Sequence, residues 1–228
     1  MRILIADDHA MLRGGLKQIL VLEYPGAIFG EAGNYQETLA RVDQEPWDVL
    51  VLDIFMPGRS GLDVLRELEA GKPELPVLVL SSAPEEQMAV RVLRAGAAGY
   101  LNKRAAPEEL ARAVKKVAGG GTYASAKLGE KLAGDLARPS CAPHEQLSDR
   151  EFQVMQMLAA GKFIKEIAAD LALSPKTVST FRTRLMGKLR LQSDVELVRY
   201  TLEHNLVESS VLPRPTPSKP VGRDSVEP

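Results

Sequence analysis

The sequence predicts an α/β domain built on a doubly wound, five-stranded parallel sheet, followed by an all-α domain of four helices. Two observations lead to this fold class. Over the first half of the chain, short apolar runs alternate with amphipathic segments, which is typical of parallel strands joined by helices. After residue 147, apolar residues recur at helical spacing. A length of 228 residues is enough for one or two domains at roughly 150 residues each.

Composition excludes several classes of protein. The formal charge is −1, and 45% of residues are hydrophobic, which rules out a disordered polyelectrolyte. The single cysteine, Cys141, excludes a disulfide framework and a cysteine-based zinc cluster. No apolar stretch approaches the ~18 residues of a membrane span, and the acidic start is unlike a signal peptide. We therefore expect a soluble, cytoplasmic protein.

Five apolar runs in the first half are the predicted strands, and the segments between them are the predicted helices. The strands are expected at 2–6, 27–31, 49–52, 76–80 and 99–101. The helices are expected at 10–22, 35–44, 61–70, 85–95 and 107–118. Strands that are apolar throughout imply a sheet covered by helices on both faces. Ligands of such sheets bind beyond the carboxyl ends of the strands.

Polar residues lie at these strand ends. Asp7 and Asp8 follow the first strand, Asp53 ends the third, Ser81 ends the fourth and Lys103 follows the fifth. Singly, they can be a helix cap, a turn residue or a solvated lysine. Together they predict one cleft, where crowded carboxylates need a hard cation such as Mg²⁺. An aspartate beside a divalent ion and a lysine can attack phosphorus, and Asp53 is the central candidate.

With Met56-Pro57-Gly58, Ala95-Gly96-Ala97 and Gly99-Tyr100, these residues make the segment 1–118 resemble a response-regulator receiver domain. The resemblance implies that a sensor histidine kinase phosphorylates Asp53. It implies that Mg²⁺ is bound directly by two carboxylates and one backbone carbonyl, and through water by a third carboxylate: Asp8, Asp53, the carbonyl of Phe55, and Asp7. It also implies a phosphoryl-binding and switch set, which consists of Ser81, Tyr100 and Lys103.

The middle and the end of the chain are predicted to be connecting segments. We expect a linker at 119–146, with a flexible joint at Gly119-Gly120-Gly121, a short helix around Leu128 and an extended tether at the prolines near 139–143. Residues 208–228 contain five prolines with three acids and three bases. This composition predicts a disordered tail.

The segment 147–207 has the pattern of a helix-turn-helix domain. Ser148 with Glu151 forms a capping box, and a later helix begins with Pro175 after the capping residue Ser174. Positions 174–190 contain five basic residues and no acid. A charged helix face is often only solvated, but an all-basic helix after a tight turn favours a reader of the DNA major groove.

This segment also resembles the LuxR-type domain of NarL/FixJ response regulators, through Leu147-Ser148-x-Arg150-Glu151, Lys165-Glu166-Ile167-Ala168 and Leu173–Val178. Phe181, where the family often has histidine, favours a GacA/UvrY-like branch. The resemblance implies base contacts by Ser179, Thr180 and Thr183. It implies phosphate contacts by Lys176, Arg182, Arg184 and Lys188.

The combination predicts a two-component transcription regulator that is phosphorylated on Asp53 and then binds double-stranded promoter DNA, as a homodimer. RNA polymerase is a further candidate partner, and no enzymatic activity beyond its own phosphorylation and dephosphorylation is expected. One alternative is an aspartyl-phosphate phosphatase, but that needs an acid two residues after Asp53, where Phe55 stands. A second alternative is a receiver that acts only by protein contact, and the basic run argues against it.

Overall fold

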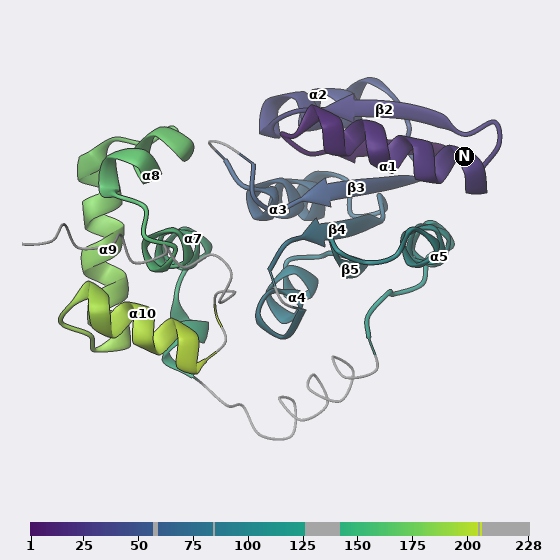
Figure 1. Cartoon of the computed structure of the whole chain (residues 1–228). Helices are drawn as coiled ribbons and strands as arrows, with labels where there is room; N and C mark the ends of the chain where they lie inside the picture. Colours follow the sequence, from purple (N-terminus) through teal and green to yellow (C-terminus); the bar gives the residue numbers. More distant parts are fainter. Residues whose placement is uncertain (57–58, 84, 126–141, 205, 207–228) are drawn as a thin grey trace, which may run out of the picture.

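The computed structural model describes residues 1–56, 59–83, 85–125, 142–204 and 206, which form an α/β domain and an all-α domain (Figure 1). In the α/β domain, strands and helices alternate along the chain. The strands are β1 (Arg2–Ala6), β2 (Ile28–Ala32), β3 (Val49–Asp53), β4 (Val77–Ser81) and β5 (Gly99–Asn102). The helices are α1 (Ala10–Glu23), α2 (Tyr35–Gln44), α3 (Gly61–Gly71), α4 (Glu85–Arg94) and α5 (Pro107–Ala118).

The five strands form one parallel sheet in the order β2-β1-β3-β4-β5, which confirms the predicted fold class. Because β1 lies between β2 and β3, the order of connection reverses there, and ligands of such sheets bind at this switch. The strand bounds differ from the sequence prediction by one residue at several ends. In particular, β3 and β4 include the polar residues Asp53 and Ser81 that follow their apolar runs.

The sheet is buried on both faces because each central strand is apolar on both sides. Ile5 and Val51 pack on one face against Leu20 of α1 and Val114 of α5. The opposite face packs against α2, α3 and α4, with side chains that include Leu4, Leu50, Val42, Leu65 and Val92. The carboxyl ends of β1, β3 and β4 are therefore held in fixed relative positions by a core on each side.

Two parts of the predicted linker make regular backbone hydrogen bonds, and the second of them corrects the expectation of an extended tether at Pro143. After Gly121, Tyr123 forms a parallel bridge with Gly99 at the edge of β5. The segment Pro143–Gln146 is a 3₁₀ helix, η1, in which Pro143 takes a first-turn position where no N–H is needed. The predicted helix around Leu128 and the predicted tail at 208–228 lie outside the described residues.

The second domain consists of α7 (Asp149–Ala159), α8 (Ile164–Asp170), α9 (Pro175–Leu189) and α10 (Asp194–Glu203). Ser148 caps α7 through the predicted box with Glu151, and Ser174 caps α9 by accepting from the N–H of Thr177 at 3.1 Å. The turn between α8 and α9 is tight because Ala172 adopts a φ of 51°. The predicted sequence of four helices is confirmed.

Within the described part of the chain, we find no helix with the length and apolar character needed to cross a bilayer.

Gly61 at the start of α3 has a steric role that another glycine of the same helix lacks. A Cβ at Gly61 would lie 2.3 Å from the backbone oxygen of Asp53, whereas a Cβ at Gly71 would meet nothing within 4 Å. We expect Gly61→Ala to lower the free energy of unfolding by about 1–3 kcal/mol through this overpacking. Gly71→Ala is the matched control and should leave it unchanged or raised, as measured by urea unfolding. Equal stability of the two variants would contradict the close approach.

Candidate phosphorylation site and DNA interface

A buried charged cluster lies at the carboxyl edge of the sheet. Asp7 and Asp8 follow β1, Asp53 ends β3, and Lys103 follows β5. The ammonium Nζ of Lys103 lies 2.7 Å from Oδ2 of Asp7 and 2.8 Å from Oδ2 of Asp53. Asp7 and Asp53 are almost fully buried. The structure thus brings together four of the five strand-end residues that the sequence singled out for this edge.

The cluster holds more negative charge than Lys103 can neutralise. Burial raises the pKa of Asp53 above its ordinary value, although Lys103 acts in the opposite direction. Burial would lower the pKa of Lys103, but the carboxylates of Asp53 and Asp7 outweigh it and the pKa is raised. Oδ1 of Asp8 is buried and accepts no hydrogen bond within the part of the chain described. A hard divalent cation fits this set of oxygens, because carboxylates are the ligands it prefers.

Phe55, the residue whose carbonyl is the expected backbone ligand, contacts one of these carboxylates. Phe55 donates its N–H to Oδ1 of Asp53 at 3.2 Å, which orients that carboxylate. The following turn at Pro57 and Gly58, which the sequence marked, lies outside the described residues.

The two predicted switch residues both hydrogen-bond to the backbone of Ala83, in the loop between β4 and α4. Oγ of Ser81 accepts from the N–H of Ala83 at 3.1 Å. The hydroxyl of Tyr100, which is 2% exposed, donates to the carbonyl of Ala83. Asn102 also donates to that carbonyl, at 3.0 Å, and the N–H of Lys103 donates to the carbonyl of Ser81 at 2.9 Å. Movement of Ser81 therefore disturbs the loop that leads into α4. Sequence reasoning missed both Ala83 and Asn102. Ala83 acts through its backbone carbonyl, which any residue type can supply, so its identity in the sequence gives no signal.

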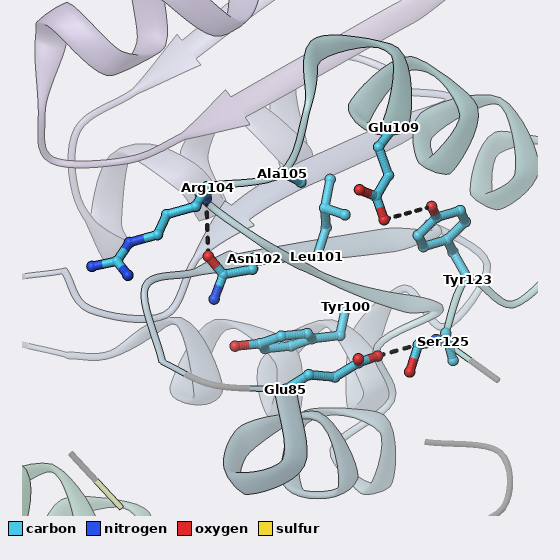
Figure 2. Close-up of a pocket in the computed structure, with 10 residues that line it drawn as sticks. Glu85, Tyr100, Leu101, Asn102, Arg104, Ala105, Glu109, Tyr123 and Ser125 are labelled. Carbon is cyan, nitrogen blue, oxygen red and sulfur yellow. Dashed lines mark hydrogen bonds between the residues drawn. The ribbon is translucent and has the colours of Figure 1, made fainter. Parts of the chain in front are cut away.

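A cavity of about 310 Å³ lies along β5, between this loop and α5 (Figure 2). Its far wall is the segment after α5, which is tied to the domain at three places. The N–H of Tyr100 donates to the carbonyl of Tyr123 at 3.0 Å, and the Tyr123 hydroxyl donates to Glu109 at 3.2 Å. The N–H of Ser125 donates to Glu85 of α4 at 3.1 Å. The first residues after α5 thus pack beside Tyr100.

Helices α3 and α4 contact the start of α7 in the second domain, and sequence reasoning did not foresee this contact. Arg91 of α4 donates to Asp149 at 2.9 Å and to the carbonyl of Leu147 at 2.8 Å. Its guanidinium also lies 4.7 Å from the ring centre of Phe152. Arg66 of α3 forms a second ion pair with Asp149. No signal in the sequence marks such pairs, because exposed arginines and aspartates are common.

A third pair between the domains includes a residue that caps α3. Arg150 donates to Oδ2 of Asp63 at 3.1 Å. The same oxygen accepts from the N–H of Ser60 at 2.8 Å, at the first turn of α3. One carboxylate therefore links the start of α3, which follows the Asp53 loop, to the start of α7.

The predicted DNA-contacting residues on α9 differ in their exposure and in their hydrogen bonds. Lys176, Thr180, Thr183 and Arg184 are exposed. The hydroxyls of Ser179, Thr180 and Thr183 donate to the helix backbone four residues earlier, which leaves their oxygen lone pairs outward as acceptors.

Two of the predicted phosphate contacts are engaged within the domain. Arg182 pairs with Asp194 at 2.8 Å. Lys188 donates to Glu151 at 2.6 Å and to the carbonyl of Gln146 at 3.2 Å. Burial would raise the pKa of Glu151, but Lys188 and the backbone of Ser148 lower it. As placed here, Lys188 joins α9 to α7.

Comparison with known proteins gives a family match for each of the two domains. Residues 3–115 match the response regulator receiver domain family, and residues 145–201 match the luxR family of bacterial regulatory proteins. The response regulator UvrY of Escherichia coli K12 is 33% identical over 212 residues, which cover 92% of this chain and 97% of UvrY. The chain belongs to the response-regulator family. It is a regulator of transcription with a receiver domain and a LuxR-type DNA-binding domain.

A second relative is GacA, to which the interpretation of Phe181 also pointed. GacA of Pseudomonas viridiflava is 34% identical over 211 residues, covering 92% of this chain and 99% of GacA. Among solved structures, RcsB of Salmonella typhimurium has a TM-score of 0.68 and 25% identity, covering 89% of this chain and 97% of RcsB. RcsB bound to the rprA promoter with the phosphomimetic BeF₃⁻ has a TM-score of 0.62 and 25% identity, covering 88% of this chain and 98% of RcsB.

The charge imbalance of the acidic cluster generates a prediction about stability. Asp53→Asn removes a buried carboxylate, and burial raises the pKa of this group. Without divalent ions the variant should therefore be more stable, and its melting temperature should rise by about 2–4 °C for each 1 kcal/mol gained in the free energy of unfolding. Addition of Mg²⁺ should stabilise the original protein more than the variant, because the ion binds the folded state.

Thermal unfolding in EDTA and in millimolar Mg²⁺ tests this, and Asp43→Asn, at an exposed site, is the control. A lower melting temperature of Asp53→Asn in EDTA would contradict the imbalance.

Proposed function

We propose that Asp53 accepts a phosphoryl group from a sensor histidine kinase with Mg²⁺ in the acidic cleft, and that the product binds promoter DNA as a homodimer in the cytoplasm. The observation that supports this most is the ion-paired group of Asp7, Asp53 and Lys103 beside the buried Oδ1 of Asp8. A metal ion held by Asp8, Asp53 and the Phe55 carbonyl, with Asp7 acting through water, would neutralise the phosphoryl oxygens.

The chain's own residues divide the phosphoryl transfer between them. A carboxylate oxygen of Asp53 attacks phosphorus, the bond from phosphorus to the histidine nitrogen breaks, and an acyl phosphate forms. Lys103 already lies 2.8 Å from Asp53, so its ammonium is positioned to pair with the incoming phosphoryl oxygens. Ser81, whose Oγ accepts from the N–H of Ala83, supplies a hydroxyl hydrogen for a third phosphoryl oxygen.

The phosphorylation state reaches the second domain through α4. When Ser81 turns toward the phosphoryl group, its bond to Ala83 is lost, and Ala83 is also the acceptor of Tyr100. The loop that carries Ala83 leads directly into α4, whose Arg91 holds Asp149 and the carbonyl of Leu147. A displacement of α4 therefore changes the contact that positions α7. By linkage, release of α7 changes the ease of phosphorylation by the same free energy.

The face of α9 that bears Lys176, Thr180, Thr183 and Arg184 supports binding in the major groove, with the threonines and Ser179 at base edges. Arg182 can reach phosphate after leaving Asp194, which is exposed. The solved structure in which two RcsB dimers bind two parallel DNAs supports a dimeric state on DNA; its TM-score is 0.54 at 25% identity. RNA polymerase remains the further partner that we propose for a promoter-bound regulator.

The phosphoacceptor is tested by labelling. Acetyl phosphate with Mg²⁺ should add one phosphoryl group to the protein, and Asp53→Asn should abolish it, because the nucleophile is removed. Asp43→Asn, at an exposed site outside the cluster, is the control and should still be labelled. Intact mass spectrometry gives the stoichiometry. Labelling that persists in Asp53→Asn would overturn the assignment.

Two substitutions separate phosphate from base contacts on α9. Arg184→Ala should weaken binding to all DNA sequences and reduce the salt slope by about one unit, because one phosphate contact is lost. Thr183→Ala should change the base preference and leave the slope unchanged. Fluorescence anisotropy at several salt concentrations, with specific and random duplexes, measures both quantities. If both variants shift the preference equally, this division of contacts is wrong.

The contact between the domains is tested on α4. Arg91→Gln should increase hydrogen exchange at Leu147 and in the first turn of α7, and should shrink the difference in DNA affinity with and without BeF₃⁻. Arg94→Gln, an exposed position on the same helix, is the matched control. Unchanged exchange at α7 in Arg91→Gln would show that the contact does not position the DNA-binding domain.

A further inference from the structure

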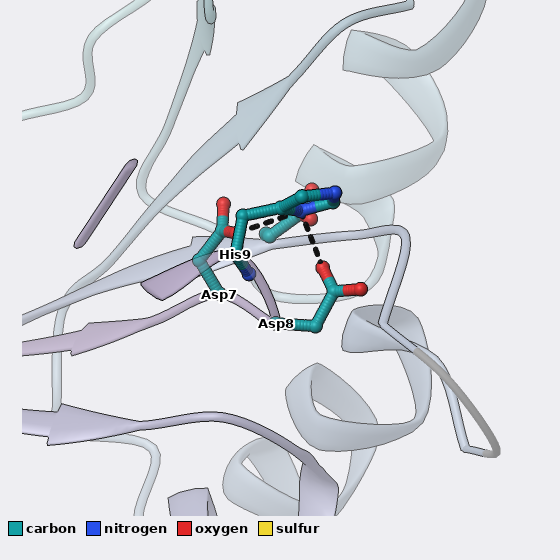
Figure 3. Close-up of side chains that lie close together, drawn as sticks. Asp7, Asp8 and His9 are labelled. Atoms are coloured by element: carbon teal, nitrogen blue, oxygen red, sulfur yellow. Dashed lines mark hydrogen bonds and ion pairs between the residues drawn. The ribbon is translucent and has the colours of Figure 1, made fainter. Parts of the chain in front are cut away.

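His9, directly after the two strand-end acids, lies over the acidic cluster (Figure 3). It occupies the capping position of α1, yet its side chain makes no capping hydrogen bond to that helix. Its N–H instead donates to Oδ1 of Asp7 at 2.8 Å. Its ring nitrogen Nδ1 lies 2.9 Å from Oδ1 of Asp8 and 3.3 Å from Oδ1 of Asp7. The imidazole is therefore folded back onto the carboxylates.

We infer that His9 is a nitrogen ligand in this cation site, so that it raises the affinity of later first-row divalent ions such as Ni²⁺ relative to that of Mg²⁺. This inference rests on the proposal that the acidic cleft holds a divalent cation. It adds a ligand that the oxygen set described above does not include, and with it a selectivity among metals.

The distances suit coordination. Adjacent ligands at right angles around a metal, with bonds of about 2.1 Å, are about 3 Å apart. The 2.9 Å between Nδ1 of His9 and Oδ1 of Asp8 matches this edge. One ligand atom from each of Asp7, Asp8, His9 and Asp53 can be chosen so that all lie within 4.8 Å of one another. A small adjustment of side chains brings such atoms around one ion.

The environment of Asp8 supports the same conclusion. Although Nδ1 of His9 is 2.9 Å away, Oδ1 of Asp8 is buried and accepts no hydrogen bond from any described residue. The hydrogen bond of the ring is instead made with Asp7. A buried carboxylate oxygen without a hydrogen bond is costly, and a cation bound by both this oxygen and the ring nitrogen would remove the cost.

The chemistry of the ligands predicts the direction of selectivity. Mg²⁺ prefers oxygen ligands and keeps its waters, whereas imidazole suits the later first-row divalent ions. Carboxylates alone already bind those ions more tightly than they bind Mg²⁺. The contribution of His9 is therefore the part of this difference in affinity that is lost when the imidazole is removed by substitution. His9 is 69% exposed at its side chain, so rotation of the ring to meet an ion displaces no packed neighbour in the core.

The test uses the full chain loaded with Mn²⁺ and a spectroscopic readout. Electron spin echo modulation should show coupling to an imidazole nitrogen in the original protein and lose it in His9→Gln. The chain has three histidines, so the double variant His144→Gln/His204→Gln is the matched control and should keep the coupling. Calorimetry on that double-variant background should show that His9→Gln weakens the binding of Ni²⁺ by about tenfold and the binding of Mg²⁺ by less than about twofold.

Each outcome has a distinct meaning. Mn²⁺ binding that Mg²⁺ displaces, without nitrogen coupling, would overturn the role of His9 and leave the cation site intact, with His9 only ion-paired to the carboxylates. Absence of both Mn²⁺ and Mg²⁺ binding would overturn the cation site itself. Nitrogen coupling that persists in His9→Gln and is lost in the double variant would place the ligand elsewhere in the chain and overturn the inference.

Discussion

The ammonium of Lys103, held between two buried carboxylates, is the interaction on which the functional edge of this protein depends. It ties the ends of β1 and β3 to the segment after β5, at 2.7 Å from Asp7 and 2.8 Å from Asp53. One cation cannot balance the surrounding aspartates, and that deficit is what makes the cleft receptive to a metal ion. If the charges in the cleft were fully balanced by protein groups, binding of a metal ion would gain little electrostatic free energy. The site therefore retains electrostatic strain that a ligand relieves.

The two domains are connected through side chains as well as through the chain. Asp63 at the start of α3 and Arg91 in the middle of α4 both reach the first turn of α7. Both helices follow loops of the phosphorylation cleft, so the DNA-binding domain is oriented by the elements nearest to the chemistry. Among the described residues, the side-chain hydrogen bonds and ion pairs to the receiver domain involve η1, Leu147 and the first turn of α7, and none involves α9.

Most of the fold follows from local pattern, whereas the contacts between elements do not. The strands were predictable because their apolar residues are continuous, and Asp53 and Ser81 were predictable as site residues because they break those runs. The role of Arg91 was not, because its partners lie more than fifty residues away and its charge alone favours solvent. The prolines near residue 143 predicted an extended tether, but packing against α9 stabilises a 3₁₀ turn at Pro143–Gln146.

The bridge between Gly99 and Tyr123 bears on where the first domain can be cut from the chain. Strand β5 is one of the two outer strands of the sheet, and the edge groups of Ala98, just before it, and of Tyr100 are paired with Tyr123. Gly99 permits this approach, since a Cβ there would lie 3.0 Å from the Tyr123 oxygen. A receiver fragment ending at residue 118 would lose this cover and present an open strand edge, the usual template for edge-to-edge association. A fragment ending at residue 125 keeps the edge closed.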